Sequence, residues 1–254
     1  MSKRNKRLMG WIALCSLAAL ALSCGMIAKA RQNYLQEAQA YTRLREIAVI
    51  SEAQEEETQL LNVDFDRLLD MNPDCMGWIE IPGTGISYPV VQGEDNDQYL
   101  RRDFAGNKSV GGVIFLDYRS SGDFSGTNTV IYGHNMRDGS MFGSLAQYLD
   151  PDFAKLHPEI RIYTPQGLRS YTVFAAYTAT TGWDCFTFQF QTDLERENWI
   201  QSQCAHALYD TGIRPGVYDE IITLVTCVGG ENEYRNILQA VRVDCGEEAA
   251  STAH

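Results

Sequence analysis

The stretch Ile221–Cys227 has the sequence IITLVTC, an apolar and β-branched run that ends at a cysteine. A glycine pair and a polar loop follow it, and then come Arg235 and a second apolar run, Asn236–Val243. This pattern predicts a strand, a loop and a second strand. Cys227 is then either a nucleophile at a strand end or a small buried hydrophobe, which is what a free cysteine usually is.

The predicted hairpin decides which arginine lies near Cys227. In an antiparallel pair the end of the first strand faces the start of the second, so Cys227 and Arg235 become neighbours. Arg242 lies seven residues further on, about 23 Å along the strand at ~3.3 Å per residue, and does not reach the same place. Taken alone, Arg235 could also be a solvated charge at the end of a loop.

The chain from Met76 onward has the pattern of a mainly β fold. Short apolar or alternating segments bounded by turns predict six further strands. Eight strands with few helices between them favour closure into a barrel, because closure removes exposed edges. A capping box at Thr192–Glu195 predicts a helix that runs to about Tyr209, inserted before the cysteine strand. The six further strands are expected at 77–82, 86–91, 112–117, 128–132, 159–164 and 168–178.

The N-terminal segment predicts a single transmembrane helix. Leu8–Ala28 carries no charge, and at about 1.5 Å per residue it is long enough to cross a bilayer core of about 30 Å. A cleaved signal peptide has a shorter apolar region of about 7–15 residues. Basic residues clustered before the span place the N-terminus in the cytoplasm and the rest of the chain outside. Lipidation of Cys24 is a less favoured alternative.

The domain division follows from this anchor. Residues 1–7 are the predicted cytoplasmic tail and residues 8–28 the transmembrane anchor. Spacings of three and four from Gln32 to Leu61 predict an amphipathic helix, so residues 29–62 are expected to form a helical stalk, loosened by an acidic patch at 52–57. Residues 63–246 are the predicted catalytic domain, and residues 247–254 a C-terminal tail.

Charge and cysteine usage limit the partners and cofactors. The formal net charge is −12, from 33 acidic and 21 basic residues, which argues against a nucleic-acid partner. The seven cysteines include no CxxC pair and no regular spacing with histidine, so a zinc site is not expected. An odd count in a chain of this length does not suggest a disulfide framework. No metal ion or other cofactor is expected.

A nucleophilic cysteine needs a nearby base or cation, because the thiolate is the reactive form. Of the four histidines, His134 is the best placed, since it directly follows the predicted strand 128–132. Gly133 would allow a tight turn that presents the imidazole at the strand end. Taken alone, a single histidine is more often structural than catalytic.

Read together, these segments resemble the sortases, and class B sortases in particular. The shared features are Thr223–Cys227, the run Tyr-Gly-His-Asn-Met at 132–136, and Arg235 on the following strand. Further similar segments occur at 77–79, 88–93, 97–104, 114–117 and 141–142, and in the helix 192–210. The resemblance extends over roughly 63–243.

The resemblance implies an extracytoplasmic cysteine transpeptidase of a Gram-positive-type bacterium. Such an enzyme cuts a C-terminal sorting signal after a threonine and passes the acyl group to an amine of the cell-wall precursor or to a pilin lysine. By this resemblance Cys227 attacks the threonine carbonyl and His134 moves the proton of the amine. Arg235 is a poor base, and as a fixed cation it suits the oxyanion of the tetrahedral intermediate.

The resemblance also implies substrate contacts, at Asn96, Leu100, Thr181, Phe186 and Leu224, each of which could equally serve packing. The chain departs from the class pattern at Val225, where some members have serine, and in a short loop between Cys227 and Arg235. The sorting motif therefore stays open.

Two other functions are compatible with parts of the pattern. A Cys-His peptidase could hydrolyse wall peptides with water as acceptor, although such enzymes usually have the cysteine before the histidine. A membrane-anchored β-domain could bind a wall ligand without catalysis, but it would need Cys227, His134 and Arg235 to occupy these positions by chance.

Overall fold

The structure is a computed structural model of the chain, and it describes residues 3–50, 60–180, 182–228 and 233–243. The chain divides into two compact units, residues 1–43 and residues 44–254. Three of the predicted features lie outside the described residues: the substrate contact at Thr181, the acidic patch at 52–57 and the tail at 247–254.

The N-terminal helix α1 (Lys3–Ala48) is continuous. Among the described residues, its segment Leu14–Ala48 is long and apolar enough to cross a membrane, judged by length and composition. The spacing after Gln32 predicted a helix that the acidic patch at 52–57 ends or loosens, and α1 ends at Ala48, before that patch. Strand β1 (Val49–Ile50) follows and pairs antiparallel with β2 (Asn62–Val63). Both residues of β1 are β-branched and therefore favour an extended strand over another helical turn.

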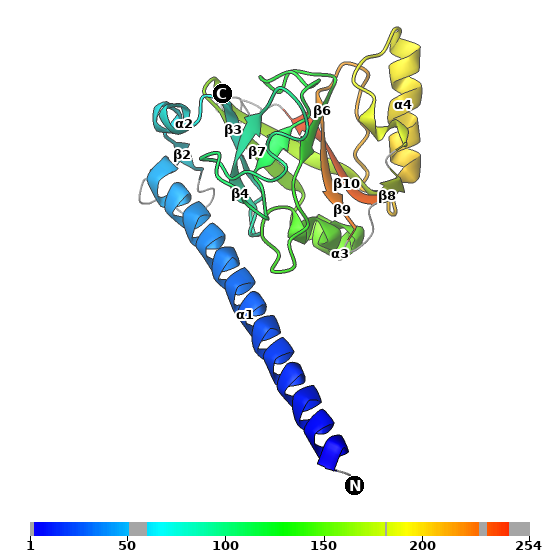
Figure 1. Cartoon of the computed structure of the whole chain (residues 1–254). Coiled ribbons are helices and arrows are strands. Elements are labelled where there is room, and N and C mark those ends of the chain that lie inside the picture. Colours follow the sequence, from blue (N-terminus) through cyan, green and yellow to red (C-terminus); the bar gives the residue numbers. More distant parts are fainter. Residues whose placement is uncertain (1–2, 51–59, 181, 229–232, 244–254) are drawn as a thin grey trace, which may run out of the picture. The chain divides into compact units, whose positions relative to one another are not determined.

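Eight further strands form a closed barrel (Figure 1), which confirms the predicted fold class. Each predicted strand overlaps one that the structure contains. The sheet is mixed, because two of its neighbouring pairs are parallel and the others are antiparallel. The strands are β3 (Cys75–Glu80), β4 (Ser87–Gln92), β5 (Ile114–Leu116), β6 (Asn128–Tyr132), β7 (Glu159–Thr164), β8 (Gly167–Thr180), β9 (Ile221–Cys227) and β10 (Tyr234–Val243). Around the barrel their order is β10-β8-β7-β3-β4-β5-β6-β9.

The predicted hairpin is confirmed by β9 and β10, which pair antiparallel with Cys227 directly opposite Arg235. Arg242 lies at the other end of β10, where its Nη1 donates to Glu220 Oε2 at 2.7 Å. The hairpin geometry thus separates the two arginines as the spacing predicted.

The helices are short and begin at recognisable caps. They are α2 (Phe65–Met71), α3 (Pro151–Leu156) and α4 (Asp193–His206), with 3-10 turns η1 (Gly143–Leu149) and η2 (Asp184–Phe186). Thr192 caps α4, since its Oγ1 accepts from the backbone N–H of Glu195 at 3.1 Å. The Glu195 carboxylate accepts from the N–H of Gln191, one residue before the partner that a capping box uses. The helix ends at His206, short of Tyr209.

Helix α4 packs on the outer side of the barrel, where its buried side chains meet residues of β8, β9 and β10 (Figure 1). Trp199 and Ile200 of α4 join a buried apolar cluster with Val225 and other strand residues. Because side chains alternate along a strand, the odd-numbered residues of β9 face α4 and the even-numbered ones face the barrel interior. Cys227 has the same parity as Val225, so it projects on the outer side, just beyond the covered part of the strand.

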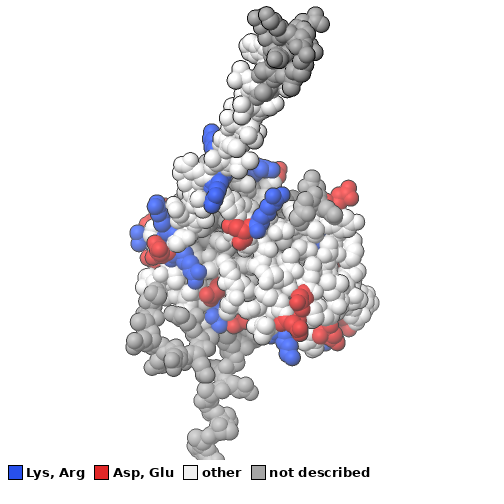
Figure 2. Space-filling view, turned by 90° about the horizontal axis from the view of Figure 1, so that it is seen from below, with Lys and Arg blue, Asp and Glu red and all other residues white. Residues whose placement is uncertain are grey.

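Acidic and basic side chains are mixed on the face of the molecule in Figure 2. The described residues on this face do not gather into the single basic patch that a phosphate backbone would require.

Candidate active site

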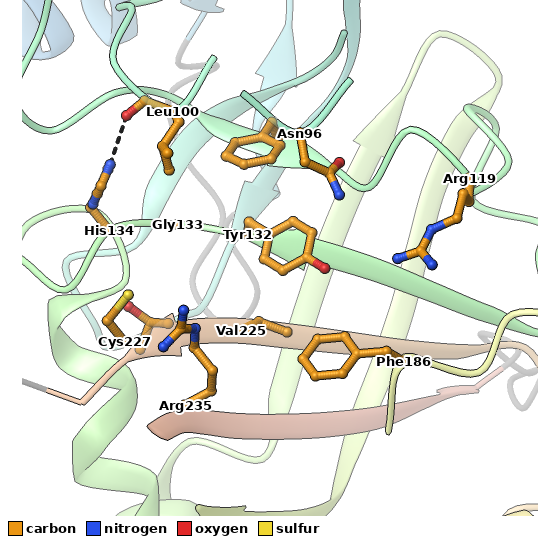
Figure 3. A pocket seen from close by; sticks show the side chains of 12 residues that line it. Asn96, Leu100, Arg119, Tyr132, Gly133, His134, Phe186, Val225, Cys227 and Arg235 are labelled. Carbon is orange, nitrogen blue, oxygen red and sulfur yellow. Dashed lines mark hydrogen bonds between the residues drawn. The ribbon is translucent and has the colours of Figure 1, made fainter. Parts of the chain in front are cut away.

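A cavity of about 410 Å³ lies at the end of β9, beside Cys227. Figure 3 shows His134, Cys227 and Arg235 at one end of it and Arg119 at the other, with Tyr132, Val225 and Phe186 between them. The cavity therefore extends from the thiol at one end to a guanidinium at the other. Its lining residues are Asn96, Leu100, Phe115, Arg119, Tyr132, Gly133, His134, Phe186, Val225, Thr226, Cys227 and Arg235.

Strand register brings the three candidate catalytic residues together. On one side of β9, Arg235 is the direct antiparallel partner of Cys227. On the other side, β6 runs parallel to β9 with Tyr132 opposite Val225. His134 and Cys227 each lie two residues beyond that pair, so the two side chains emerge at the same level of the sheet. Cys227 thus stands between the imidazole and the guanidinium.

His134 is held by the chain on both sides of the cavity mouth. Its Nε2 lies 2.7 Å from the carbonyl oxygen of Leu100, and because a carbonyl only accepts, Nε2 must donate. The backbone N–H of Phe142 donates to the His134 carbonyl at 3.0 Å. Among the described residues Nδ1 has no hydrogen-bond partner, so the second ring nitrogen remains available for a proton from the thiol or from a substrate.

Asn135 connects the histidine loop to the cysteine strand. Its Nδ2 donates to the backbone carbonyl of Cys227 at 2.7 Å. This short hydrogen bond fixes the separation between the loop that carries His134 and the end of β9. Asn135 therefore sets how far the imidazole stands from the thiol.

Gly133 is required by packing rather than by an unusual turn. A Cβ at this position would lie 2.6 Å from two ring atoms of Phe142, a contact that real side chains do not make. Gly112, at φ +59°, similarly admits the carbonyl oxygen of Leu100, which would lie 2.8 Å from a Cβ there. Both glycines let the backbone close around His134, and the sequence prediction of a tight turn at Gly133 is replaced by this explanation.

Aromatic rings form the middle of the cavity. The rings of Phe115 and Tyr132 lie with centroids 5.3 Å apart, and Tyr132 and Phe186 stack with centroids 6.5 Å apart. Phe115 and Tyr132 are register partners on β5 and β6, which explains their contact. The walls are therefore apolar in the middle and polar at both ends.

Cys227 is distinguished from the buried thiols by its exposure. Burial raises the pKa of Cys75 and of Cys185 to about 12, so both stay protonated and shielded. Cys227 is half-buried and lines the cavity, and Cys204 is half-buried elsewhere. Only a thiol that a substrate can reach is able to act as a nucleophile.

The structure brings six of the eight predicted site residues into this cavity. Leu224 is not among them: it is fully buried, and alternation along β9 turns it toward the barrel interior, away from Val225 and Cys227. Thr181 lies outside the described residues. The six that line the cavity are Asn96, Leu100, His134, Phe186, Cys227 and Arg235.

Several lining residues were not singled out from the sequence. Phe115 and Tyr132 could have been singled out by alternation, since each lies inside a segment already quoted for the resemblance, 114–117 and 132–136. Arg119 carries no sequence signal of its own. It follows β5 by three residues, and only the closure of the barrel brings it to the cavity.

Comparison with known proteins agrees with the site. A family model for the sortase domain matches residues 79–243. Sortase B of Listeria monocytogenes serovar 1/2a (strain ATCC BAA-679 / EGD-e) is 40% identical over 162 residues, which are 63% of this chain and 65% of that protein, just under two thirds of its length.

Solved structures agree as well. Sortase B from Bacillus anthracis, in complex with AAEK1, has a TM-score of 0.74 and 32% identity, covering 84% of this chain and 99% of that one. The Staphylococcus aureus sortase B–substrate complex has a TM-score of 0.73 and 28% identity, covering 85% of this chain and 100% of that one. The resemblance found in the sequence is confirmed, and the chain belongs to class B of the sortase family.

Proposed function

We propose that this chain is a membrane-anchored transpeptidase that cleaves a C-terminal sorting signal after a threonine and transfers the acyl group to an amine. The observation that carries the proposal is the single cavity in which Cys227, His134 and Arg235 meet at the end of β9. Family membership supports the reaction type, and the apolar segment of α1 supports the anchor. Localisation at the cell membrane, with the N-terminus inside and the barrel outside, follows from the clustered basic residues at the N-terminus.

The first half of the reaction uses the thiol and the imidazole. The Cys227 thiol passes its proton to Nδ1 of His134, and the resulting thiolate attacks the threonine carbonyl carbon. A C–S bond forms as the carbonyl oxygen becomes an oxyanion. The C–N bond then breaks, and protonated His134 gives its Nδ1 proton to the leaving amine. A thioacyl enzyme and a free C-terminal fragment result. Nε2 keeps its proton throughout, because it donates to Leu100.

The second half reverses these roles. An acceptor amine attacks the thioester carbon, Nδ1 of neutral His134 takes a proton from that amine, and the C–S bond breaks to return the Cys227 thiolate. Arg235 faces the same space, where its guanidinium suits the oxyanion that forms in both halves. Candidate acceptors are a lipid-linked cell-wall precursor and a pilin lysine.

The rest of the cavity is proposed to hold the sorting signal. Leu100 offers apolar surface beside His134, and Phe186 offers it in the middle of the cavity. Asn96 offers an amide at the opposite wall. The solved Staphylococcus aureus relative that was captured with a substrate supports peptide binding of this kind.

Amine dependence separates transfer from hydrolysis. The purified enzyme, incubated with a library of threonine-containing sorting peptides and a small amine such as triglycine, is expected to give an amide-linked product that increases with amine concentration. Mass spectrometry identifies the bond that was cut and the product. Cleavage that yields only the free acid at every amine concentration would assign the chain to the hydrolytic alternative, and no cleavage of any peptide would reject both.

Asn135→Ala is expected to lower kcat about tenfold while leaving KM within about twofold, because the lost hydrogen bond positions the histidine loop and does not contact substrate. Steady-state peptide cleavage measures both constants. Asn107→Ala is a matched control, since its side chain bonds only Asp103 in an exposed loop. A rise in KM with unchanged kcat would show that Asn135 contributes to binding instead.

A further inference from the structure

A buried carboxylate lies behind the end of the cavity opposite Cys227. Asp117 follows β5 and is completely buried, yet it does not line the cavity. It accepts hydrogen bonds from three side chains that do. Arg119 donates from Nε and Nη2 at 2.8 Å each, Asn96 donates from Nδ2 at 3.0 Å, and Tyr132 donates from its hydroxyl at 3.0 Å.

These three side chains come from separate parts of the wall. Asn96 belongs to the loop after β4, Tyr132 ends β6, and Arg119 follows β5. Asn96 also accepts from the backbone N–H of Tyr118 at 3.1 Å, so its amide orientation is determined on both sides. The long side chain of Arg119 and the amide of Asn96 can rotate unless their polar ends are held. The Tyr132 hydroxyl ends a ring that already packs on Phe115 and Phe186.

Arg119 extends the connection to a fourth part of the wall. Its guanidinium carbon lies 4.2 Å from the ring centroid of Phe188, within the range of a cation–π contact. Phe188 follows Phe186, which stacks on Tyr132 inside the cavity. One carboxylate therefore connects the β4–β5 loop, β6 and the segment before α4.

Only a carboxylate can satisfy all of these donors at once. An ionised aspartate offers two oxygens and about four acceptor sites and has no proton to place. Burial acts to raise the pKa of Asp117, but the hydrogen bonds from Arg119, Asn96 and Tyr132 outweigh it and lower the pKa below the ordinary value. The group is ionised throughout the neutral range, and an amide in its place would direct a donor at another donor.

We propose that Asp117 is a positioning residue for substrate recognition, and that it acts through Asn96, Tyr132 and Arg119 to fix the wall of the cavity remote from the thiol. The inference rests on the proposed function, since it assigns this wall to the sorting signal. It separates the site into a chemical end, held by Asn135, and a recognition end, held by Asp117.

Asp117→Asn is expected to raise KM for a sorting peptide about five- to tenfold, with kcat within about twofold of the native enzyme. The rate at which Cys227 reacts with a small alkylating reagent is expected to stay within about twofold, because the thiol lies at the other end of the cavity. Unchanged KM would overturn the proposal. So would a parallel loss of kcat and thiol reactivity, which would indicate a general structural role.

Glu220→Gln provides the matched control for lost charge pairing. Glu220 Oε2 also accepts from two arginines, Arg169 at 2.8 Å and Arg242 at 2.7 Å, but at the far end of the hairpin from the cavity. The control is expected to reduce thermal stability without changing KM. A KM increase in Glu220→Gln equal to that in Asp117→Asn would mean that the loss of any arginine–carboxylate pair has this effect, and would reject the specific role.

Tyr132→Phe tests the same connection if Asp117→Asn folds poorly. This substitution removes only the hydroxyl that donates a hydrogen bond to Asp117 and leaves the ring packed against Phe115 and Phe186. We expect KM to rise about two- to threefold in Tyr132→Phe. Where Asp117→Asn folds, the double variant is expected to show less than the product of the two single effects on KM. If the increases in KM of the two single variants simply multiply in the double variant, the two residues act independently and the proposed coupling is overturned.

The two proposals can fail separately. If the native enzyme cleaves no threonine-containing peptide, the proposed function fails. If it cleaves such a peptide and both variants keep the native KM, only the inference about Asp117 fails.

Discussion

Replacing Cys227 by alanine is expected to abolish peptide cleavage, with kcat/KM reduced about 10⁴-fold or more. The variant keeps the cavity, the imidazole and the guanidinium but has no nucleophile, and neither His134 nor Arg235 can form the acyl intermediate. Because Cys227 is half-buried at the end of a strand, loss of its sulfur should change the free energy of unfolding by no more than about 0.5 kcal/mol. Product formation by mass spectrometry and thermal unfolding by circular dichroism measure the two effects separately.

Cys204→Ala is the matched control for this substitution. Cys204 is also half-buried, on α4, and it does not line the cavity. Its replacement is expected to leave cleavage at the native rate, and intact-protein mass spectrometry should show a peptide adduct on this variant and none on Cys227→Ala. Residual turnover of Cys227→Ala within about a hundredfold of native would reject thioacyl catalysis at this site.

The parts of the site that lie close together along the chain could be predicted from the sequence. The hairpin of β9 and β10 depends on neighbouring segments, so strand spacing alone placed Arg235 beside Cys227 and Arg242 elsewhere. The parallel pairing of β6 with β9 joins segments about ninety residues apart, and nothing local determines it. His134 was therefore selected by its position at a strand end and by resemblance, and the register that sets it level with Cys227 emerged only from the closed barrel.

Other features were missed for identifiable reasons. Leu224 was placed on the cavity floor because it belongs to the shared cysteine motif, although alternation from Cys227 already places it on the opposite face of β9. Asp117 was noted only as the last residue of the similar segment 114–117, because a buried carboxylate with several partners cannot be told from a surface aspartate by its neighbours in sequence. The end of α1 at Ala48 reflects pairing of β1 with β2, a tertiary contact that outweighs helical spacing.

Arg235→Lys is expected to lower kcat about 10²–10³-fold with little change in KM, the size of effect seen when an oxyanion donor is lost. Lysine keeps the positive charge, but it replaces a planar fork of donors by a single compact ammonium on a flexible stem. The native guanidinium is oriented by the register of β10 opposite Cys227 and by its Nη1 bond to the Tyr234 carbonyl at 2.9 Å. An ammonium in this place would be attracted to the oxyanion without being held at the right point in space. Pre-steady-state acylation with a sorting peptide measures the step directly.

Arg242→Lys distinguishes this role from a general need for arginine on β10. Arg242 lies on the same strand and is ion-paired with Glu220 at 2.7 Å, so its replacement should alter stability slightly and leave acylation at the native rate. The two possible roles of Arg235 predict opposite results for Arg235→Lys. If the geometry of the guanidinium donors matters, acylation is lost, whereas a purely electrostatic role would be largely preserved by the ammonium. Near-native acylation in Arg235→Lys would therefore assign Arg235 to charge stabilisation at a distance. A large loss in Arg235→Lys that Arg242→Lys does not share would show that the fork of donors opposite Cys227 is what the transition state requires.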